Sequence, residues 1–257
     1  MRPSIILGFA ALYGLSGVGS NCHAQSQPGS VALRPATPAE TQQAPKFTFL
    51  LFSRGNDANT QRVTQELSTA LSTRADRTQW QAINVTDPAN EHLVKQYQLG
   101  RAPMPLVLCV APNGTVTGVM PGRVTEKQVE ASLVTPTMTR CMKSLQAGKI
   151  VVVHVKVDPH DELPSAAVEF MSDPSFANRT VTESFLMADP AEGRFLRDMK
   201  FDPATASGST VAVLAPPGML VGKFAVTATA SDIASALHEA GKCCNDPNCK
   251  HNQKKGQ

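Results

Sequence analysis

Val107-Leu108-Cys109-Val110-Ala111-Pro112-Asn113-Gly114 reads as a buried strand that ends in a tight turn, and the chain contains this pattern twice. The second copy is Val211-Ala212-Val213-Leu214-Ala215-Pro216-Pro217-Gly218. In both copies the strand stops at Ala-Pro because proline has no N–H for a ladder, and the glycine permits the positive φ of a tight reversal. A second glycine, at 118 or 222, and a helical run follow each copy, and in the first unit this helix is expected to continue through 135–148 into a linker. The repeat therefore predicts two similar units in tandem.

Composition and charge fit a globular protein. The chain has 257 residues, of which 42% are hydrophobic and 18% are charged, so it carries enough apolar material for two cores. The formal net charge of +3 is too small to indicate a nucleic-acid partner. Much of the positive surplus lies in the last residues of the chain, at Lys242, Lys250, Lys254 and Lys255.

The first residues predict export. Arg2 precedes an apolar run at 5–15 that is too short to span a bilayer, and small residues follow it. This pattern is typical of a secretory signal peptide. The expected processing is cleavage after Ala24, cleavage after Gly19, or lipid attachment at Cys22. We expect a periplasmic or extracellular protein, with membrane contact only if Cys22 is lipidated.

Apolar periodicity predicts the elements that precede each copy of the repeat. A polar segment rich in Gln, Ser, Thr and Pro comes first, and it is expected to be a linker. The first unit then carries predicted strands at 46–52 and 80–85 and helices at 60–73 and 87–97. The second unit carries predicted strands at 149–157 and 180–187 and helices at 165–171 and 190–199.

The first unit, with its order β-α-β-α-β-β-α, resembles a thioredoxin-like domain. The residues that carry the resemblance are Asn84-Val85-Thr86-Asp87, Tyr97-Gln98-Leu99, Met104-Pro105-Leu106-Val107-Leu108 and the glycines at 114, 118 and 122. The resemblance implies that Pro105 is cis and lies beside the site, where Met104 offers its backbone to an extended peptide. Composition alone favours a trans proline that starts an edge strand.

The second unit resembles a degenerate copy of the same fold, because Ser209-Thr210 stands where the first unit has Pro105. We therefore predict an α/β protein with two tandem thioredoxin-like domains, each a mixed central sheet flanked by helices. The predicted segments are a signal peptide at 1–24, a disordered linker at 25–45, a first domain at 46–148, a degenerate second domain at 149–241 and a Cys/Lys-rich tail at 242–257.

The chemistry expected of this fold is missing from the first unit. Thiol-disulfide exchange needs Cys-x-x-Cys just after the first strand, where a helix N-terminus stabilises a thiolate. That place holds Arg54-Gly55-Asn56-Asp57-Ala58-Asn59, in which Asn56 and Asp57 read as helix caps. By analogy with the family, the predicted binding residues are Asn56, Asp57, Asn59, Met104 and Pro105.

The remaining cysteines fall into two groups. Cys109 lies within an apolar strand and reads as a packing residue. Cys141 follows a helix and is flanked by Met138 and Met142, so it is expected to cap the last helix face of the first unit and not to act as a nucleophile. The tail places Cys243, Cys244, Cys249 and His251 close together. This cluster is compatible with an exposed disulfide, with a zinc or copper site, or with no role.

The absence of paired cysteines favours a binding function. The chain is similar to the non-catalytic domains of protein disulfide isomerases, and this implies a redox-inactive module that holds a protein or an extended peptide without a cofactor. The alternative is a thiol-disulfide oxidoreductase or a metal-handling protein that uses the tail cysteines.

Overall fold

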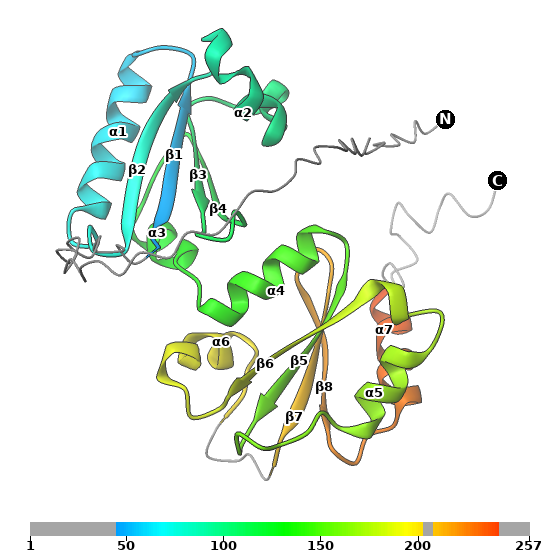
Figure 1. Ribbon diagram of the computed structural model, residues 1–257. Coiled ribbons are helices and arrows are strands. Elements are labelled where there is room, and N and C mark those ends of the chain that lie inside the picture. Colours follow the sequence, from blue (N-terminus) through cyan, green and yellow to red (C-terminus); the bar gives the residue numbers. More distant parts are fainter. Residues whose placement is uncertain (1–44, 203–207, 242–257) are drawn as a thin grey trace, which may run out of the picture. The chain divides into compact units, whose positions relative to one another are not determined.

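The computed structural model of the protein describes residues 45–202 and 208–241, and these form two mixed four-stranded sheets (Figure 1). In the first sheet the strand order is β2-β1-β3-β4, with β2 parallel to β1 and the other neighbours antiparallel. Its strands are β1 (Phe47–Ser53), β2 (Thr78–Asn84), β3 (Leu106–Val110) and β4 (Val116–Pro121). Its helices are α1 (Ala58–Leu71), α2 (Glu91–Gln96) and α3 (Glu126–Ser132).

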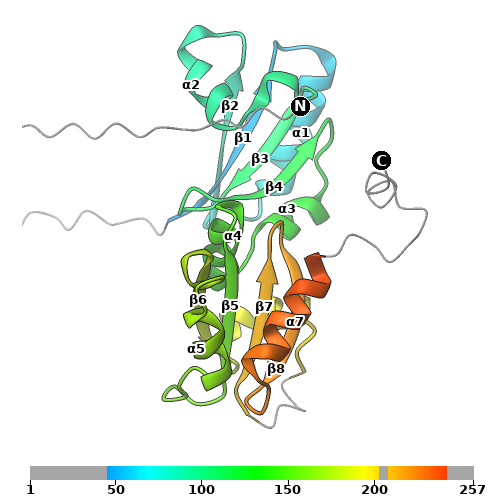
Figure 2. The ribbon, with the colours of Figure 1, turned by 90° about the vertical axis from the view of Figure 1, so that its right-hand side faces the viewer.

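The second sheet repeats this topology, with the order β6-β5-β7-β8 and only β5 and β6 parallel (Figure 2). Its strands are β5 (Ile150–Lys156), β6 (Thr180–Leu186), β7 (Thr210–Ala215) and β8 (Met219–Ala225). The helices around it are α4 (Pro136–Gln146), α5 (Ser165–Ser172), α6 (Gly193–Asp198) and α7 (Ala230–Gly241). In the described part of the chain, no helix is both long and apolar enough to cross a bilayer.

The repeat seen in the sequence is confirmed down to the pairing of single residues. Cys109 pairs with Gly118 in the first sheet as Val213 pairs with Gly222 in the second. Each antiparallel pair also carries a β-bulge at the residue that follows. Both turn glycines adopt the expected positive φ, 84° at Gly114 and 135° at Gly218. The two units are therefore copies of one α/β arrangement.

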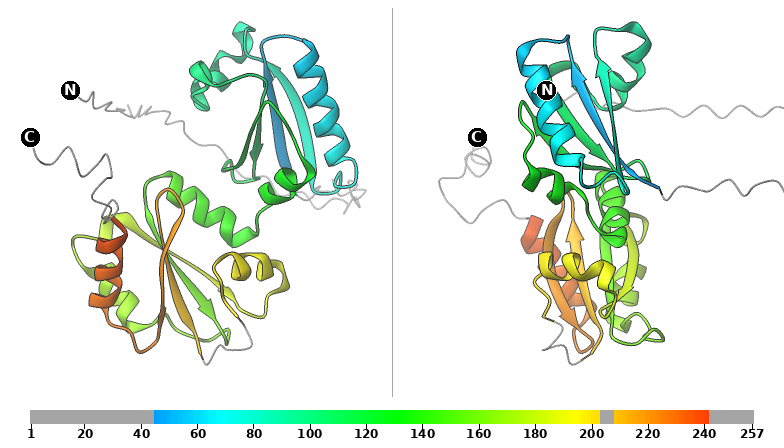
Figure 3. Two further views of the ribbon diagram at one scale, coloured as in Figure 1. Left: turned by 180° about the vertical axis from the view of Figure 1, so that it is seen from behind. Right: turned by 90° about the vertical axis from the view of Figure 1, so that its left-hand side faces the viewer.

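Each sheet has an apolar core on both faces, as central strands covered by helices require. In the first sheet, α1 covers one face and α2 lies beside the other (Figure 3). Alternate residues of β1 such as Phe49 and Leu51 pack under α1 and α3, while Phe52 packs in the core on the α2 side. The face of α1 that lies in the core is the predicted one, with Val63, Leu67, Ala70 and Leu71 buried. In the second sheet the core under α5 and α7 contains Val152, Phe170, Val213 and Ile233.

Helix α4 differs from the prediction, which carried the last helix of the first domain onward into a linker. Instead α3 stops at Ser132, and Pro136 starts a new helix behind the cap Thr135, whose hydroxyl accepts the Met138 N–H at 3.3 Å. Although α4 falls within 46–148, its buried residues Cys141 and Leu145 lie in the core of the second sheet.

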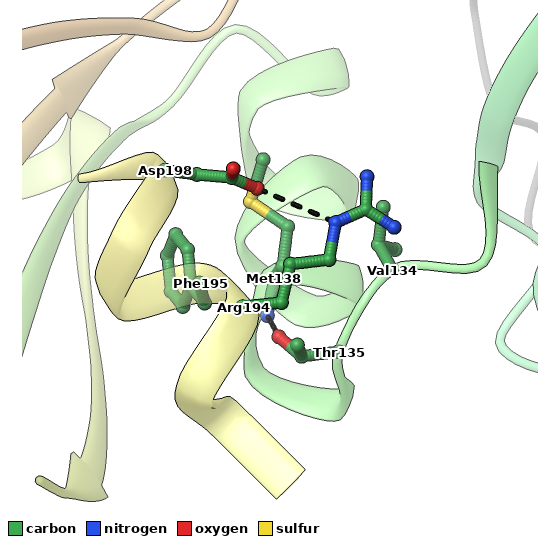
Figure 4. Close-up of a pocket in the computed structure, with 6 residues that line it drawn as sticks. All are labelled: Val134, Thr135, Met138, Arg194, Phe195 and Asp198. Carbon is green, nitrogen blue, oxygen red and sulfur yellow. Dashed lines mark hydrogen bonds and ion pairs between the residues drawn. The ribbon is translucent and has the colours of Figure 1, made fainter. Parts of the chain in front are cut away.

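Arg194 of α6 binds the carboxyl-terminal end of α3. Its guanidinium donates to the carbonyls of Glu130 at 2.6 Å, Ala131 at 3.0 Å and Leu133 at 3.3 Å. The last carbonyls of a helix lack backbone partners, so Arg194 satisfies acceptors at Ala131 and Leu133 that would otherwise need water. It adds a second donor at Glu130, whose carbonyl also accepts the Leu133 N–H at 3.3 Å. The same side chain pairs with Asp198 at 3.7 Å (Figure 4).

Glu192 accepts a hydrogen bond from the start of α4. Its side chain is 2% exposed, and its Oε1 accepts the Thr137 N–H at 2.7 Å. A carboxylate at a helix N-terminus is stabilised by the free N–H groups there. One short segment thus supplies a hydrogen-bond donor, Arg194, for the end of α3 and an acceptor, Glu192, for the start of α4. The hollow between these elements has no room for a water molecule. Figure 4 labels its lining residues, Val134, Thr135, Met138, Arg194, Phe195 and Asp198.

Gly118→Ala should destabilise the protein, because α3 packs directly over this glycine. A Cβ at Gly118 would lie 2.0 Å from the Ser132 Oγ and 2.7 Å from the Ser132 Cβ. We expect a loss of about 1–3 kcal/mol in the free energy of unfolding, measured by urea denaturation. Gly100→Ala is the matched control, since a Cβ there meets nothing within 4 Å. Equal losses in both variants would contradict the close approach of α3 to β4.

Candidate functional site

The pairing of β1 with β3 brings two distant segments to one end of the first sheet. Phe52 pairs with Leu106, so Pro105 lies level with the loop that leads from Ser53 to α1. The Met104–Pro105 peptide bond is cis, as the family resemblance implied. The predicted residues Asn56, Asp57, Asn59, Met104 and Pro105 therefore belong to the same end of the sheet.

Asp57 caps α1, as its sequence context predicted. Its Oδ1 accepts the Thr60 N–H at 2.7 Å, and this hydrogen bond lowers the pKa of the carboxyl. The carboxylate thus occupies the anion-binding N-terminus of the helix, where a thiolate would be stabilised in a thiol-dependent member of the fold. Asn56 and Asn59 flank it and are exposed to solvent, so their amides are free to contact a partner.

Met104 and Pro105 are held from behind by the core and by the next strand. Met104 is half-buried against the core on the α2 side, which includes Phe52 and Tyr97. The Pro105 carbonyl accepts the Gly122 N–H at 2.8 Å, and Gly122 has a φ of 67°. These contacts fix the backbone at residues 104 and 105 in one conformation.

Arg62 and Glu66 complete this end of the sheet, and they were missed in the sequence. Arg62 donates to the Gly122 carbonyl at 2.9 Å and to Glu66 at 2.8 Å. Glu66 in turn accepts the Val124 N–H at 2.8 Å, which lowers the pKa of its carboxyl. The pair ties α1 to the segment that holds Pro105. The only signal in the sequence was their i,i+4 spacing on a helix.

The two cysteines of the described residues are poor nucleophiles. Cys109 and Cys141 are both 0% exposed, which confirms that Cys109 is a packing residue, while Cys141 packs in the core of the second sheet and not on the first unit as expected. Burial raises the pKa of the Cys109 thiol to about 11 and that of the Cys141 thiol to about 12. Because the thiolate is the reactive form, neither side chain supplies a nucleophile at neutral pH.

In the second domain the corresponding place is closed by the chain itself. Val155 pairs with Thr210, so Ser209 occupies the position that Pro105 has in the first domain, as predicted. Asp161 Oδ2 accepts the Val157 N–H at 2.9 Å, the Asp158 N–H at 2.8 Å and the Ser209 hydroxyl. These hydrogen bonds lower the pKa of Asp161 and join the loop directly to the start of β7.

His154 is a buried polar residue beside this loop. It pairs with Val211 as Leu51 pairs with Val107, so a histidine here replaces a core leucine of the first domain. Its side chain is 2% exposed, and its Nε2 makes no hydrogen bond with any described residue. Burial lowers the pKa of His154, Lys156 acts in the same direction, and Asp161 opposes both.

The predicted tail cluster, Cys243, Cys244, Cys249 and His251, lies outside the described residues, as do Cys22 and the predicted signal peptide. Within 45–202 and 208–241, no group of three or more His, Cys, Asp or Glu side chains is arranged to hold a metal ion.

The sequence matches no protein family and no curated protein. Among solved structures, the chain is similar to the NTD_N/C domain of alkylhydroperoxide reductase AhpF from Enterococcus faecalis, with 16% identity, 75% of this chain and 90% of that chain covered, and a TM-score of 0.30. It is also similar to the first two thioredoxin domains of Saccharomyces cerevisiae Eps1p, with 10% identity, 82% and 99% covered, and a TM-score of 0.28. Human ERp44 matches at 8% identity, with 77% and 53% covered and a TM-score of 0.31. At these values the similarities carry no argument about activity. The thioredoxin-like fold of each half follows from its own sheet order and connections.

His154→Leu should remove a source of acid sensitivity. The folded-state pKa of His154 lies below the ordinary 6.5, so below about pH 6.5 the unfolded chain binds a proton that the folded chain does not. Wild-type stability should fall in this range by up to about 1.4 kcal/mol per pH unit, until the pH reaches the folded pKa. Urea unfolding between about pH 7.5 and pH 5 measures the slope.

The matched control for this experiment is His160→Leu, which removes an exposed histidine from the same domain. The expected result is a smaller acid slope in His154→Leu than in either the wild type or the control. Identical slopes in all three proteins would show that His154 is solvated in the folded state.

Proposed function

We propose that this two-domain thioredoxin-like protein is an exported, redox-inactive module that holds an extended segment of another protein at the Pro105 end of its first domain. One observation carries the proposal. At the N-terminus of α1, Asn56 and Asn59 stand at the spacing of a Cys-x-x-Cys pair, and Asp57, which lies between them in the sequence, accepts the Thr60 N–H with its carboxylate.

The local electrostatics support binding without electron transfer. Asp57 places a negative charge at the helix end, and such a charge disfavours a second anion, including an attacking thiolate, at the same point. The exposed amides of Asn56 and Asn59 remain available to donate and accept hydrogen bonds. A polar, exposed loop beside a fixed backbone suits main-chain recognition of an extended peptide.

The first domain is the better candidate of the two. In the described part of the chain, its loop between β1 and α1 makes no hydrogen bond to Met104 or Pro105, whereas the matching loop of the second domain is bonded through Asp161 to Ser209. A partner would have to break those bonds before it reached the second site. We therefore assign recognition to the first domain and a structural role to the second.

The alternative function uses the tail cysteines as a redox pair or as metal ligands. The two functions differ in their dependence on thiols. A binding module holds a client that has no cysteine, while a thiol-disulfide oxidoreductase needs a disulfide to act upon.

Photocrosslinking tests the proposed site. A photoreactive amino acid in place of Asn56 should form adducts with an unfolded protein whose cysteines have been carboxymethylated. The same residue in place of His160, which lies in the matching loop of the second domain and is also exposed, is the control. We expect the yield of adducts at position 56 to exceed that at position 160 by about tenfold or more, because a residue inside a binding site contacts the bound client and an exposed residue outside it does not.

Equal adduct yields at the two positions, or none at position 56, would exclude the first domain as the site. Adducts that appear only with a client carrying a disulfide would favour the tail-based oxidoreductase instead.

A further inference from the structure

The outer edge of β2 differs from the other three sheet edges. Natural sheets protect exposed edges with charges, prolines or bulges. Among the described strands, β4 carries a bulge, ends at Pro121 and has its Val116 carbonyl bound by Gln146 at 2.7 Å. β8 carries a bulge and Lys223, and β6 carries Glu183. The sequence of β2, Thr-Gln-Trp-Gln-Ala-Ile-Asn, contains none of these features and pairs with β1 without interruption.

The backbone groups on the free edge of β2 follow from the bonds on its inner edge. The Phe47 N–H donates to the Arg77 carbonyl, and the Val85 N–H donates to the Ser53 carbonyl, so residues 77 and 85 both face β1. Since successive residues of a strand point their amide groups to alternate sides, residues 79, 81 and 83 also face β1. The groups of Trp80 and Ala82 therefore face outward.

The side chains along this edge are also open. Trp80, the single tryptophan of the chain, is 39% exposed. Gln79, Gln81 and Ala82 are exposed beside it. Trp80 pairs with Phe49, whose side chain lies in the core under α1, so the indole stands at the rim of that core. An uncharged strand edge beside a partly exposed tryptophan side chain is able to pair with another strand.

We propose that this edge pairs with the β2 edge of a second copy of the chain, antiparallel and with the two-fold axis at Gln81. In this register Trp80 of each copy lies opposite Ala82 of the other. Both residues have outward amide groups, so each such pair exchanges two main-chain hydrogen bonds. Gln81 lies opposite Gln81 of the other copy in a non-hydrogen-bonded pair.

A second copy fits this edge for two reasons. When the same strand of two copies pairs antiparallel, identical residues lie near each other. Because β2 has no charged residue, this pairing brings no like charges together. The large indole of Trp80 also faces the small side chain of Ala82, so the exposed ring gains a neighbour without a clash. A two-fold, self-complementary contact is the commonest way in which identical chains associate.

The contact joins two strands and is therefore small. Interfaces at the low end of the size range are weak, so we expect a dimer that dissociates on dilution through the micromolar range. Sedimentation velocity under reducing conditions, which prevent cross-linking through tail thiols, measures the association. Trp80 reports the same event, because pairing should shift its emission to shorter wavelength and shield it from acrylamide.

A pair of opposite charges at position 81 tests the register. Gln81→Glu and Gln81→Lys each place like charges directly opposite in the homodimer, and each should weaken association on the order of fivefold at low salt. An equal mixture of the two variants should restore association to the wild-type level or above it. Gln65→Glu and Gln65→Lys, on the exposed side of α1, are the matched controls and should change nothing.

Three results would overturn the proposal. The protein could stay monomeric over the whole concentration range with Trp80 open to acrylamide. Trp80 could be shielded in the monomer, in which case residues 1–44 of the same chain cover the edge. Association could also be unaffected by the Gln81 variants, or unrestored by mixing them, and it would then use another surface.

Discussion

The antiparallel pairing of β1 with β3, with Phe52 opposite Leu106, is the interaction on which the candidate site depends. It places the loop before α1 beside Pro105, although the two segments are far apart in the sequence. The equivalent pairing of β5 with β7 does the same for the loop after β5 and Ser209. The same strand pairing thus creates an equivalent position in each domain, and the side chains at that position determine its role.

Those side chains have diverged in different directions. In the first domain the helix N-terminus is satisfied by Asp57, while Asn56 and Asn59 remain exposed. In the second domain Asp161 binds Val157, Asp158 and Ser209, and the location becomes an internal hydrogen-bond network. The first arrangement leaves room for a partner and the second uses the same position for structure. This division supports a protein in which one copy of the fold recognises and the other stabilises.

Local pattern was sufficient to predict the repeat, the strands, the turn glycines and the position of Pro105, because each depends on neighbours in the sequence. It was not sufficient for α4, because the apolar periodicity of a helix does not indicate which of two sheets the helix packs against. Contacts made by long polar side chains were equally hidden. Arg194 and Glu192 bind the ends of α3 and α4 from more than fifty residues away, and nothing local distinguishes them from solvated charges. The open edge of β2 also became visible only when the strand order placed it outermost.

The first domain places the loop of Asn56 and Asn59 at the same end of the sheet as Pro105, but it has no cysteine there, and the Asp57 carboxylate occupies the helix N-terminus. The most direct measurement is the rate of insulin disulfide reduction by the wild type and by the triple variant Asn56→Cys, Asp57→Gly, Asn59→Cys, which supplies paired thiols and removes the competing carboxylate. Both are assayed with Cys243, Cys244 and Cys249 intact and again with all three replaced by serine. The wild type should show no turnover in either background, and the triple variant should show turnover in both. Reduction of insulin by the wild type that disappears with the tail cysteines, or a triple variant that stays inert, would contradict a site whose position is retained and whose thiols are replaced.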